Sequence, residues 1–349
     1  MTEIPASDAA ASSAEPLVQA RRLTRHFAST GIFRRGRTVQ AVTEVDIALS
    51  RGEAVGLVGE SGSGKSTVGR LLLALLRPTA GQVLFEGTDL ATLDKTAQRR
   101  LRQRMQLVFQ DPYSSLDPRR RVGAQIADGL VIHGIVPASE RLERVTALLD
   151  QVGLPASHAE RFPHEFSGGQ RQRIGIARAL ATQPAFLVAD EPVSSLDVSI
   201  QAQVLALLAD LRTRLGLAML FISHDLPAVR HLCDRVIVMY LGRVMEEGPT
   251  AAVFAAPRHP YTAALLSAAP SIDPARRRKR ILLRGEPPSS VDPPSGCVFR
   301  TRCPYALPAC AESVPKLRPF GLPGQFKACL RDDIPIQGDI NGAPEDSKK

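Results

Sequence analysis

The chain has 349 residues, 44% of them hydrophobic, and a formal net charge of +9. This length can bury a full core and still leave residues for a second, smaller region. The apolar runs are strand-length, such as Ala218 to Ile222, and none approaches the roughly 20 residues that span a bilayer, which argues against a transmembrane helix. The basic charge leaves open a surface for nucleic acid or anionic lipid, or simply a solvated surface.

The first third of the chain is predicted to alternate between strands and one helix. Residues 1–16 are rich in Ala and Ser and are expected to be disordered, without the segments of a signal peptide. Alternating polarity predicts half-buried strands over 18–27 and 39–49, and a continuous apolar run predicts a buried strand over 54–58. A helix is expected from Lys65 to Leu76, ending before Pro78 with Leu71, Leu72, Leu75 and Leu76 on one face, and a strand over 82–85 follows.

The remainder is predicted to hold a helical insert, further strands and an irregular C-terminal region. Residues from about 112 to 166 carry helical spacing over 122–133 and 141–151. Buried strands are expected over 185–189 and 218–222, and two strands turn at Leu241-Gly242 within 236–245. From residue 255, Pro and Gly become frequent, which predicts a separate C-terminal region to about 335 and a disordered tail over 336–349.

One motif between the strand at 54–58 and the following helix is typical of phosphate binding. It reads Gly59-Glu60-Ser61-Gly62-Ser63-Gly64-Lys65-Ser66-Thr67. Its glycines let backbone N–H groups approach phosphate oxygens, and the helix adds its positive N-terminal end. We predict that Lys65 reaches the β- and γ-phosphates and that Ser66 ligates Mg²⁺. The nucleotide contacts expected here are Gly59, Ser61, Gly62, Ser63, Gly64, Lys65, Ser66 and Thr67.

Four polar residues follow other predicted core strands and should therefore meet at the same sheet edge. Asp190 is expected to hold Mg²⁺ with Ser66 and Gln110, and Glu191 to act as the general base on the attacking water. Gln110 follows a predicted strand at 107–109, and its amide is expected to contact the attacking water as well as the metal, which makes it a catalytic candidate too. His224 is expected to reach the γ-phosphate. Two plainer interpretations compete: adjacent acids can cap a helix, and a lone histidine is more often structural. The nearby phosphate motif favours the catalytic interpretation.

The segment Ser167-Gly168-Gly169-Gln170-Arg171-Gln172-Arg173 resembles the signature motif of the ATP-binding cassette (ABC) ATPases. The resemblance extends from about Val18 to Gly248. It implies an α/β P-loop ATPase domain over 17–254, with an antiparallel β subdomain and a helical insert. It also implies that two cassettes sandwich two ATP molecules head to tail. Ser167, Gly168, Gly169 and Gln170 would then contact ATP held by the opposite cassette, Asp197 would couple the two sites, and Phe27 would stack on adenine.

A narrower resemblance links residues 109–119, 164–170 and 259–262 to the oligopeptide/dipeptide importer branch, and the insert at 31–35 to the second of its two paralogous ATPases. The implied protein energises peptide import from the cytoplasmic face of the plasma membrane. Implied partners are a paralogous ATPase, two transmembrane permease subunits and an extracytoplasmic peptide-binding protein, with no nucleic acid. Two alternatives remain: import of another solute such as nickel chelates, and a non-transport ABC ATPase acting on nucleic acid.

Four of the five cysteines lie near the end of the chain, at Cys297, Cys303, Cys310 and Cys329. Clustered cysteines in a cytosolic chain favour a metal over disulfides, but the spacing lacks the CxxC pairs of a zinc ribbon. It resembles the cysteine motif of the same importers, which implies a [4Fe–4S] cluster with four thiolate ligands. Zinc and reduced thiols are the alternatives. Cys233 is expected to be a small buried core residue.

Overall fold

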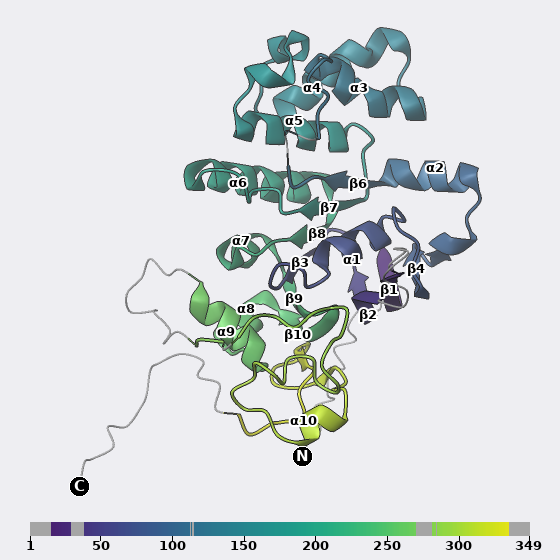
Figure 1. The fold of residues 1–349 in the computed structure, drawn as a ribbon. Coiled ribbons are helices and arrows are strands. Elements are labelled where there is room, and N and C mark those ends of the chain that lie inside the picture. Colours follow the sequence, from purple (N-terminus) through teal and green to yellow (C-terminus); the bar gives the residue numbers. More distant parts are fainter. Residues whose placement is uncertain are drawn as a thin grey trace, which may run out of the picture.

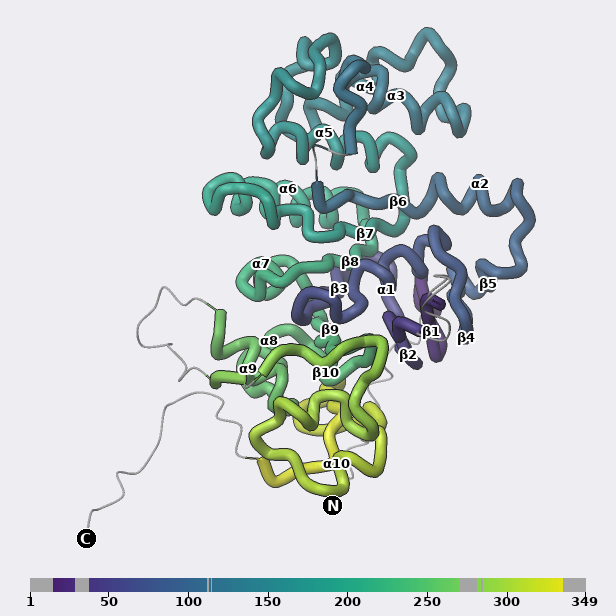
Figure 2. The backbone as a smooth tube through the Cα atoms, in the orientation of Figure 1, coloured from purple at the N-terminus to yellow at the C-terminus, as the bar shows by residue number. Residues whose placement is uncertain are grey.

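The computed structural model describes residues 15–28, 38–111, 113, 115–269, 281–283 and 285–334. The predicted disordered tail and nearly all of the predicted N-terminal lead lie outside these residues, as does the importer-like insert at 31–35. Figure 1 shows two sheets, a helical layer beyond one end of the larger sheet, and the C-terminal region beyond the other. The tube in Figure 2 shows the chain leaving the helical layer to re-enter the larger sheet.

The smaller sheet is antiparallel, and its strand order is β2-β1-β4-β5. Its strands are β1 (Val18–Ala28), β2 (Thr38–Leu49), β4 (Ala80–Phe85) and β5 (Thr88–Asp89). The larger sheet has the order β11-β12-β10-β9-β3-β8-β7-β6. Its strands are β3 (Ala54–Val58), β6 (Met105–Val108), β7 (Phe186–Asp190), β8 (Ala218–Ile222), β9 (Arg235–Tyr240), β10 (Arg243–Pro249), β11 (Arg318–Pro319) and β12 (Phe326–Lys327). The predicted α/β architecture with an antiparallel β subdomain is therefore confirmed.

The five strands from β9 to β6 pair in parallel and are covered on both faces. Along β3, Val55 and Leu57 join the core beneath the smaller sheet and α1, whereas Ala54 and Val58 join the core on the opposite face. Burial on both faces explains why these strands read as continuous apolar runs rather than alternating ones. The core on the face opposite the smaller sheet is the larger of the two, and it also includes residues of the helical layer.

The α-helices in chain order are α1 (Lys65–Leu72), α2 (Lys95–Arg104), α3 (Val122–His133), α4 (Arg141–Gln151), α5 (Gly168–Leu180), α6 (Val198–Leu215), α7 (Leu226–Leu232), α8 (Thr250–Ala255), α9 (Pro260–Ala268) and α10 (Ala309–Glu312). Short 3₁₀ turns lie at Leu90–Thr92, Ala138–Glu140, Ala156–Glu160 and Pro163–Glu165. Both helices predicted in the insert have the predicted bounds.

The prediction for the helix after the P-loop was wrong at its C-terminal end. Helix α1 stops at Leu72, and Leu75 is half exposed. The N–H of Leu75 donates to the carbonyl of Arg70 and that of Ala74 to Leu71, while Ala74 has a φ of +53°. This is a Schellman-type end with alanine in the left-handed position that glycine usually takes. The sequence therefore offered no glycine signal for the end of this helix.

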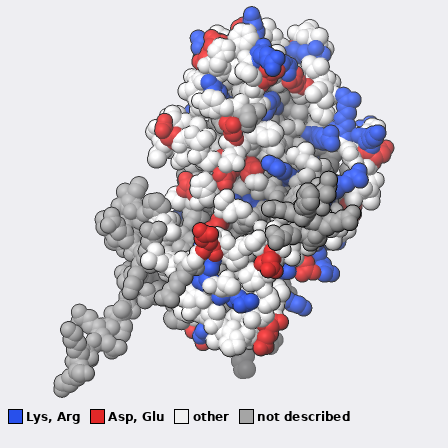
Figure 3. Space-filling model, in the orientation of Figure 1, with Lys and Arg blue, Asp and Glu red and all other residues white. Residues whose placement is uncertain are grey.

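The C-terminal region joins the larger sheet directly. Strand β12 pairs with β10 through Glu246–Lys327 and Glu247–Phe326, and β11 pairs with β12. Within the described residues, no helix is long and apolar enough to cross a membrane. On the face drawn in Figure 3, basic side chains gather over α2, whereas acidic and basic residues mix elsewhere.

Candidate nucleotide site and cysteine pocket

Four neighbouring parallel strands deliver the predicted catalytic residues to one edge of the larger sheet. Strand β3 leads into the P-loop, β7 into Asp190 and Glu191, β8 toward His224, and β6 toward Gln110. The carboxyl ends of parallel strands share an edge, which is where open α/β sheets bind ligands. The structure therefore brings together residues that are far apart in the sequence.

Two glycines of the P-loop occupy positions where any Cβ would collide with backbone. Gly59 has a φ of +152°, and an added Cβ would lie 2.1 Å from the carbonyl oxygen of Met239. Gly64 has a φ of +101°, and its Cβ would lie 2.2 Å from the carbonyl oxygen of Ala41. The loop can take its phosphate-binding shape because glycine stands at both positions.

The Lys65 ammonium lies across the loop. Its Nζ donates to the carbonyl oxygens of Gly59 and Glu60, both at 2.9 Å, and contacts the Ser63 hydroxyl at 3.4 Å. Burial lowers the pKa of Lys65, an effect that the nearby carboxylates of Glu191 and Asp190 oppose. A shielded ammonium held across the loop by two backbone carbonyl oxygens is well placed to bind anionic phosphate oxygens.

Ser66 and Asp190 form a pair of oxygen donors next to the P-loop. The Ser66 hydroxyl donates to Asp190 Oδ1 at 2.8 Å, and the Asp190 side chain is buried. Burial raises the pKa of Asp190, although the Ser66 hydrogen bond opposes this shift. A hydroxyl beside a carboxylate fits the preference of Mg²⁺ for hard oxygen ligands, and a cation here would favour the ionised carboxylate.

The Glu191 carboxylate has two polar neighbours that sequence reasoning had assigned to the site. Gln110 Nε2 donates to Glu191 Oε2 at 3.0 Å, and His224 Nδ1 lies 3.3 Å from the same oxygen. Glu191 has a φ of +46°, and its N–H donates to the carbonyl of Ile222 on β8. The backbone and two side chains thus fix the direction of one carboxylate, as a general base requires.

The signature segment lies at the start of α5 and forms a capping box. Ser167 Oγ accepts from the Gln170 N–H at 3.4 Å, and Gln170 Oε1 accepts from the Ser167 N–H at 3.1 Å. Gly168 and Gly169 pack near Leu196 and Ile200, where a Cβ on Gly169 would lie 2.3 Å from Ile200 Cγ2. The residue before α6, Asp197, is exposed. On β1, Phe27 is half-buried, with the Arg25 guanidinium 4.6 Å from its ring centroid.

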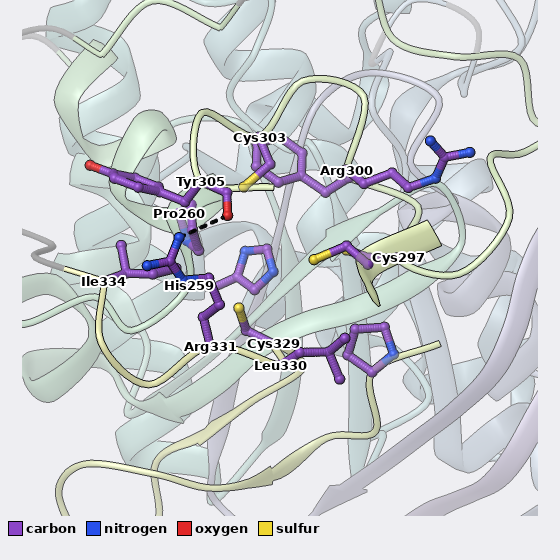
Figure 4. A pocket seen from close by; sticks show the side chains of 13 residues that line it. His259, Pro260, Cys297, Arg300, Cys303, Tyr305, Cys329, Leu330, Arg331 and Ile334 are labelled. Carbon is purple, nitrogen blue, oxygen red and sulfur yellow. Dashed lines mark hydrogen bonds between the residues drawn. The ribbon is translucent and has the colours of Figure 1, made fainter. Parts of the chain in front are cut away.

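The cysteines of the C-terminal region share one small cavity. Cys297, Cys303, Cys310 and Cys329 line it together with His259, and the sulfurs of the three labelled cysteines lie around the imidazole in Figure 4. Its volume of about 20 Å³ corresponds to one water molecule. Burial raises the pKa of Cys297, and that of Cys303 to about 11, which favours neutral thiols.

The expected iron–sulfur cluster is a wrong prediction. Among the residues that the structure describes, no group of three or more His, Cys, Asp or Glu side chains is arranged to hold a metal ion. The four cysteines of the cavity are free; Cys297 and Cys310 belong to the larger hydrophobic core, and Cys303 packs against it. Cys233, expected in the core, is indeed buried.

Sequence reasoning also missed contacts that connect the C-terminal region to the P-loop. The Arg302 guanidinium donates to the Glu60 carboxylate, and the Tyr261 hydroxyl accepts from the Glu60 N–H. Chain separations of 242 and 201 residues leave no local pattern from which either contact could be predicted.

Comparison with known proteins places this geometry in a family. Residues 42–194 match the family model described as ABC transporter, and residues 245–310 match the one described as oligopeptide/dipeptide transporter, C-terminal region. A putative peptide import ATP-binding protein of Brucella ovis is 58% identical over 91% of this chain and 99% of its own length. The dipeptide transport ATP-binding protein DppF of Escherichia coli is 48% identical, over 91% of this chain and 95% of its own length.

Solved structures agree with this assignment. The dimeric, post-hydrolysis structure of the ATP-binding cassette MJ0796, bound to ADP and Pi, matches with a TM-score of 0.60 and 29% identity, covering 67% of this chain and 98% of that one. The cbiO1 protein of Clostridium perfringens, part of a cbiONQ transporter complex, also matches with a TM-score of 0.60 and 29% identity, over 69% of this chain and 91% of its own. The chain therefore belongs to the ATPases of ABC transporters, in the group that carries the oligopeptide/dipeptide transporter C-terminal region.

Proposed function

We propose that the chain is the ATP-hydrolysing subunit that drives peptide import through a membrane ABC transporter. The observation that carries the enzymatic part is the Glu191 carboxylate, held by Gln110 and His224 at the sheet edge that also bears the P-loop. Peptide as the cargo is supported by the names of the relatives in Brucella ovis and Escherichia coli and by the matched C-terminal region.

In the proposed reaction, P-loop amides and Lys65 bind the ATP phosphates. Ser66, Asp190 and Gln110 would hold Mg²⁺, which neutralises phosphate charge when bound. Glu191 accepts a proton from the attacking water, and the bond to the leaving ADP breaks as phosphate forms. His224 orients Glu191 through the contact at 3.3 Å and would contact the γ-phosphate of bound ATP. Phe27 supplies a ring against which adenine stacks.

We also propose that the ATPase works as a head-to-tail dimer. Ser167, Gly168, Gly169 and Gln170 would contact ATP bound by the opposite cassette, and Asp197 would couple the two sites. The dimeric state of the similar cassette MJ0796 supports this arrangement. The second cassette would be a paralogous ATPase, as the insert at 31–35 indicates.

Membership of this family implies permease subunits in the membrane and a substrate-binding protein as partners. We propose that the chain attaches to the permease at the cytoplasmic face, and that the binding protein delivers peptide on the other side. Our proposed division assigns residues 17–254 to the ATPase domain, with the helical subdomain at about 112–166, and 255–335 to the importer-type region. The buried residues of both cores fall within the first of these ranges, except for six that the second adds: Tyr261, Leu266, Cys297, Val298, Phe299 and Cys310.

The test of the catalytic assignment is Glu191→Gln in the complex assembled with the permease. Loss of the general base should lower ATP turnover by about 100-fold or more while ATP binding persists. Glu143→Gln on the exposed face of α4 is the matched control, since it removes a carboxylate far from the sheet edge. ATP turnover close to wild type in Glu191→Gln would overturn the assignment. Peptide uptake by vesicles carrying the complex tests the cargo separately.

A second experiment separates the two cassettes. Lys65→Ala should weaken nucleotide binding by the isolated chain, because its ammonium belongs to the chain's own P-loop. Ser167→Arg should leave that binding intact and block hydrolysis only in the dimer. Loss of ATP binding by the isolated Ser167→Arg chain would contradict the head-to-tail proposal.

A further inference from the structure

The C-terminal region contacts the P-loop through a shielded ion pair. In the sequence, Arg302 lies between Cys297 and Cys303, and its Nη1 donates to Glu60 Oε2 at 2.7 Å. The Arg302 side chain is only 9% exposed, and that of Glu60 is 26% exposed. Because solvent screens this pair less than an exposed one, the charge of one partner matters to the other.

A second contact fixes the backbone of the same residue. The Glu60 N–H donates to the Tyr261 hydroxyl at 2.8 Å. Tyr261 is fully buried on α9 and packs against Tyr240 and Phe299, with ring centroids 4.7 and 5.3 Å away. Burial raises the pKa of Tyr261, so its hydroxyl stays protonated and neutral. A buried aromatic cluster that joins the C-terminal region to β9 thus holds the first peptide of the loop.

The backbone carbonyl of Glu60 binds the lysine of the P-loop: its oxygen accepts a hydrogen bond from Lys65 Nζ at 2.9 Å. Glu60 therefore has its N–H held by Tyr261, its carboxylate by Arg302 and its carbonyl by Lys65. A carboxylate in a phosphate-binding loop would repel ATP and compete for the lysine unless a cation neutralised it.

We propose that Arg302 and Tyr261 are positioning residues for ATP binding, through which the C-terminal region sets the affinity of the P-loop for ATP. Arg302 neutralises Glu60 and turns its carboxylate away from the phosphates, and Tyr261 holds the Glu60 peptide in place. Neither residue touches the reacting atoms. The effect is therefore on ATP binding more than on the turnover of bound ATP.

The test is a double-mutant cycle of Arg302 and Glu60, in which the affinity of the full chain for a fluorescent ATP analogue is measured. Arg302→Met keeps an unbranched side chain beside Tyr240 and should weaken binding by about tenfold at low salt, with a smaller effect at high salt. Adding Glu60→Gln removes the uncompensated charge and should bring the affinity back to within about twofold of the Glu60→Gln chain. Arg302→Lys, which keeps the charge, should retain most of the affinity.

A purely structural role for Arg302 gives a different pattern, because Glu60→Gln would then fail to restore binding. Arg300→Ala is the matched control: Arg300 belongs to the same segment but donates to Ser295, and its guanidinium points away from the cavity in Figure 4. It should bind ATP like wild type. Wild-type affinity in Arg302→Met, or a loss that persists in the double variant, overturns the proposal. Near-UV circular dichroism verifies that each chain is folded.

Discussion

Replacing Glu246 by alanine should release the C-terminal region from the edge of the larger sheet. Glu246 is fully buried on β10 and accepts hydrogen bonds from the N–H groups of Arg258 and His259 at 2.7 and 2.8 Å, and from Gln325 Nε2 at 3.0 Å. In Glu246→Ala, Gln325 keeps its contact with the carbonyl of Ala256, but the two backbone donors lose their acceptor.

The magnitude follows from those two donors. A buried donor left without a partner costs about 1–3 kcal/mol, so two of them cost about 2–6 kcal/mol. Removing a buried carboxyl group offsets part of this, since burial raises the pKa of Glu246 and shows that the ionised group is poorly solvated. We therefore expect the free energy for opening the C-terminal region to fall by an amount near the lower end of this range, about 3 kcal/mol.

Hydrogen exchange measures this loss locally. A loss of about 3 kcal/mol corresponds to about a hundredfold faster exchange in peptides from 245–269 and 285–334, at about 1.4 kcal/mol per factor of ten. Peptides covering β6 and β7 serve as an internal reference. Glu247→Gln is the matched control because successive strand residues face opposite sides. Exchange within about threefold of wild type in Glu246→Ala would refute the reasoning.

Three further predictions concern the P-loop, pH and adenine. Gly64→Ala should abolish ATP binding because its Cβ would meet the carbonyl oxygen of Ala41 at 2.2 Å. Gly62→Ala should weaken ATP binding less, because no atom lies within 4 Å of its Cβ. ATP titration compares the two variants, and equal losses of affinity would refute the steric reason. Burial lowers the pKa of His259 from 6.5 to about 3, so between these pH values only the unfolded chain binds that proton. The free energy of unfolding should therefore fall by about 1.4 kcal/mol per pH unit as the pH drops below 6.5. Urea unfolding of His259→Asn, which keeps an acceptor for the Tyr261 N–H, should show a smaller slope than wild type, and an equal slope would contradict this. Phe27→Ala should lower ATP affinity by about tenfold if the ring stacks on adenine, and unchanged affinity would remove it from the site.

The sequence was most informative where local chemistry determines the structure. The helices at 122–133 and 141–151 were predicted with their exact bounds because their apolar residues recur at helical spacing against a common core. Helix α2 was missed because it is strongly polar and buries only Leu101. Its start carries a signal that could have found it, since the Asp94 side chain accepts from the Ala97 N–H as an N-cap.

The nucleotide site was predictable for a different reason. Gln110, Asp190, Glu191 and His224 each lie at the end of a strand or within two residues of it, and parallel strands with right-handed crossovers place those positions along one edge. The positions of Gln110, Asp190 and His224 at the ends of predicted strands were therefore enough to predict that they lie close together, without any knowledge of their contacts. The cysteine cluster shows the limit of the same approach. The four thiols do line one cavity, but their spacing in the sequence does not determine whether the side chains there are arranged to hold a metal.

The C-terminal region could not be predicted because its structure depends on the ATPase sheet more than on its own sequence pattern. Its strands β11 and β12 have two residues each, too few to form a stable sheet alone, and they are ordered by pairing with β10. Its buried Lys327 lies on β12 opposite Glu246 of β10, is paired with Asp332 at 2.9 Å and lies 3.4 Å from the centroid of the Phe320 ring. Because β10 follows directly from β9, whose Tyr240 packs against Tyr261, the P-loop and the C-terminal region share one support. A change that loosens the β10 edge should therefore reach ATP binding through Glu60 as well as the stability of the region itself.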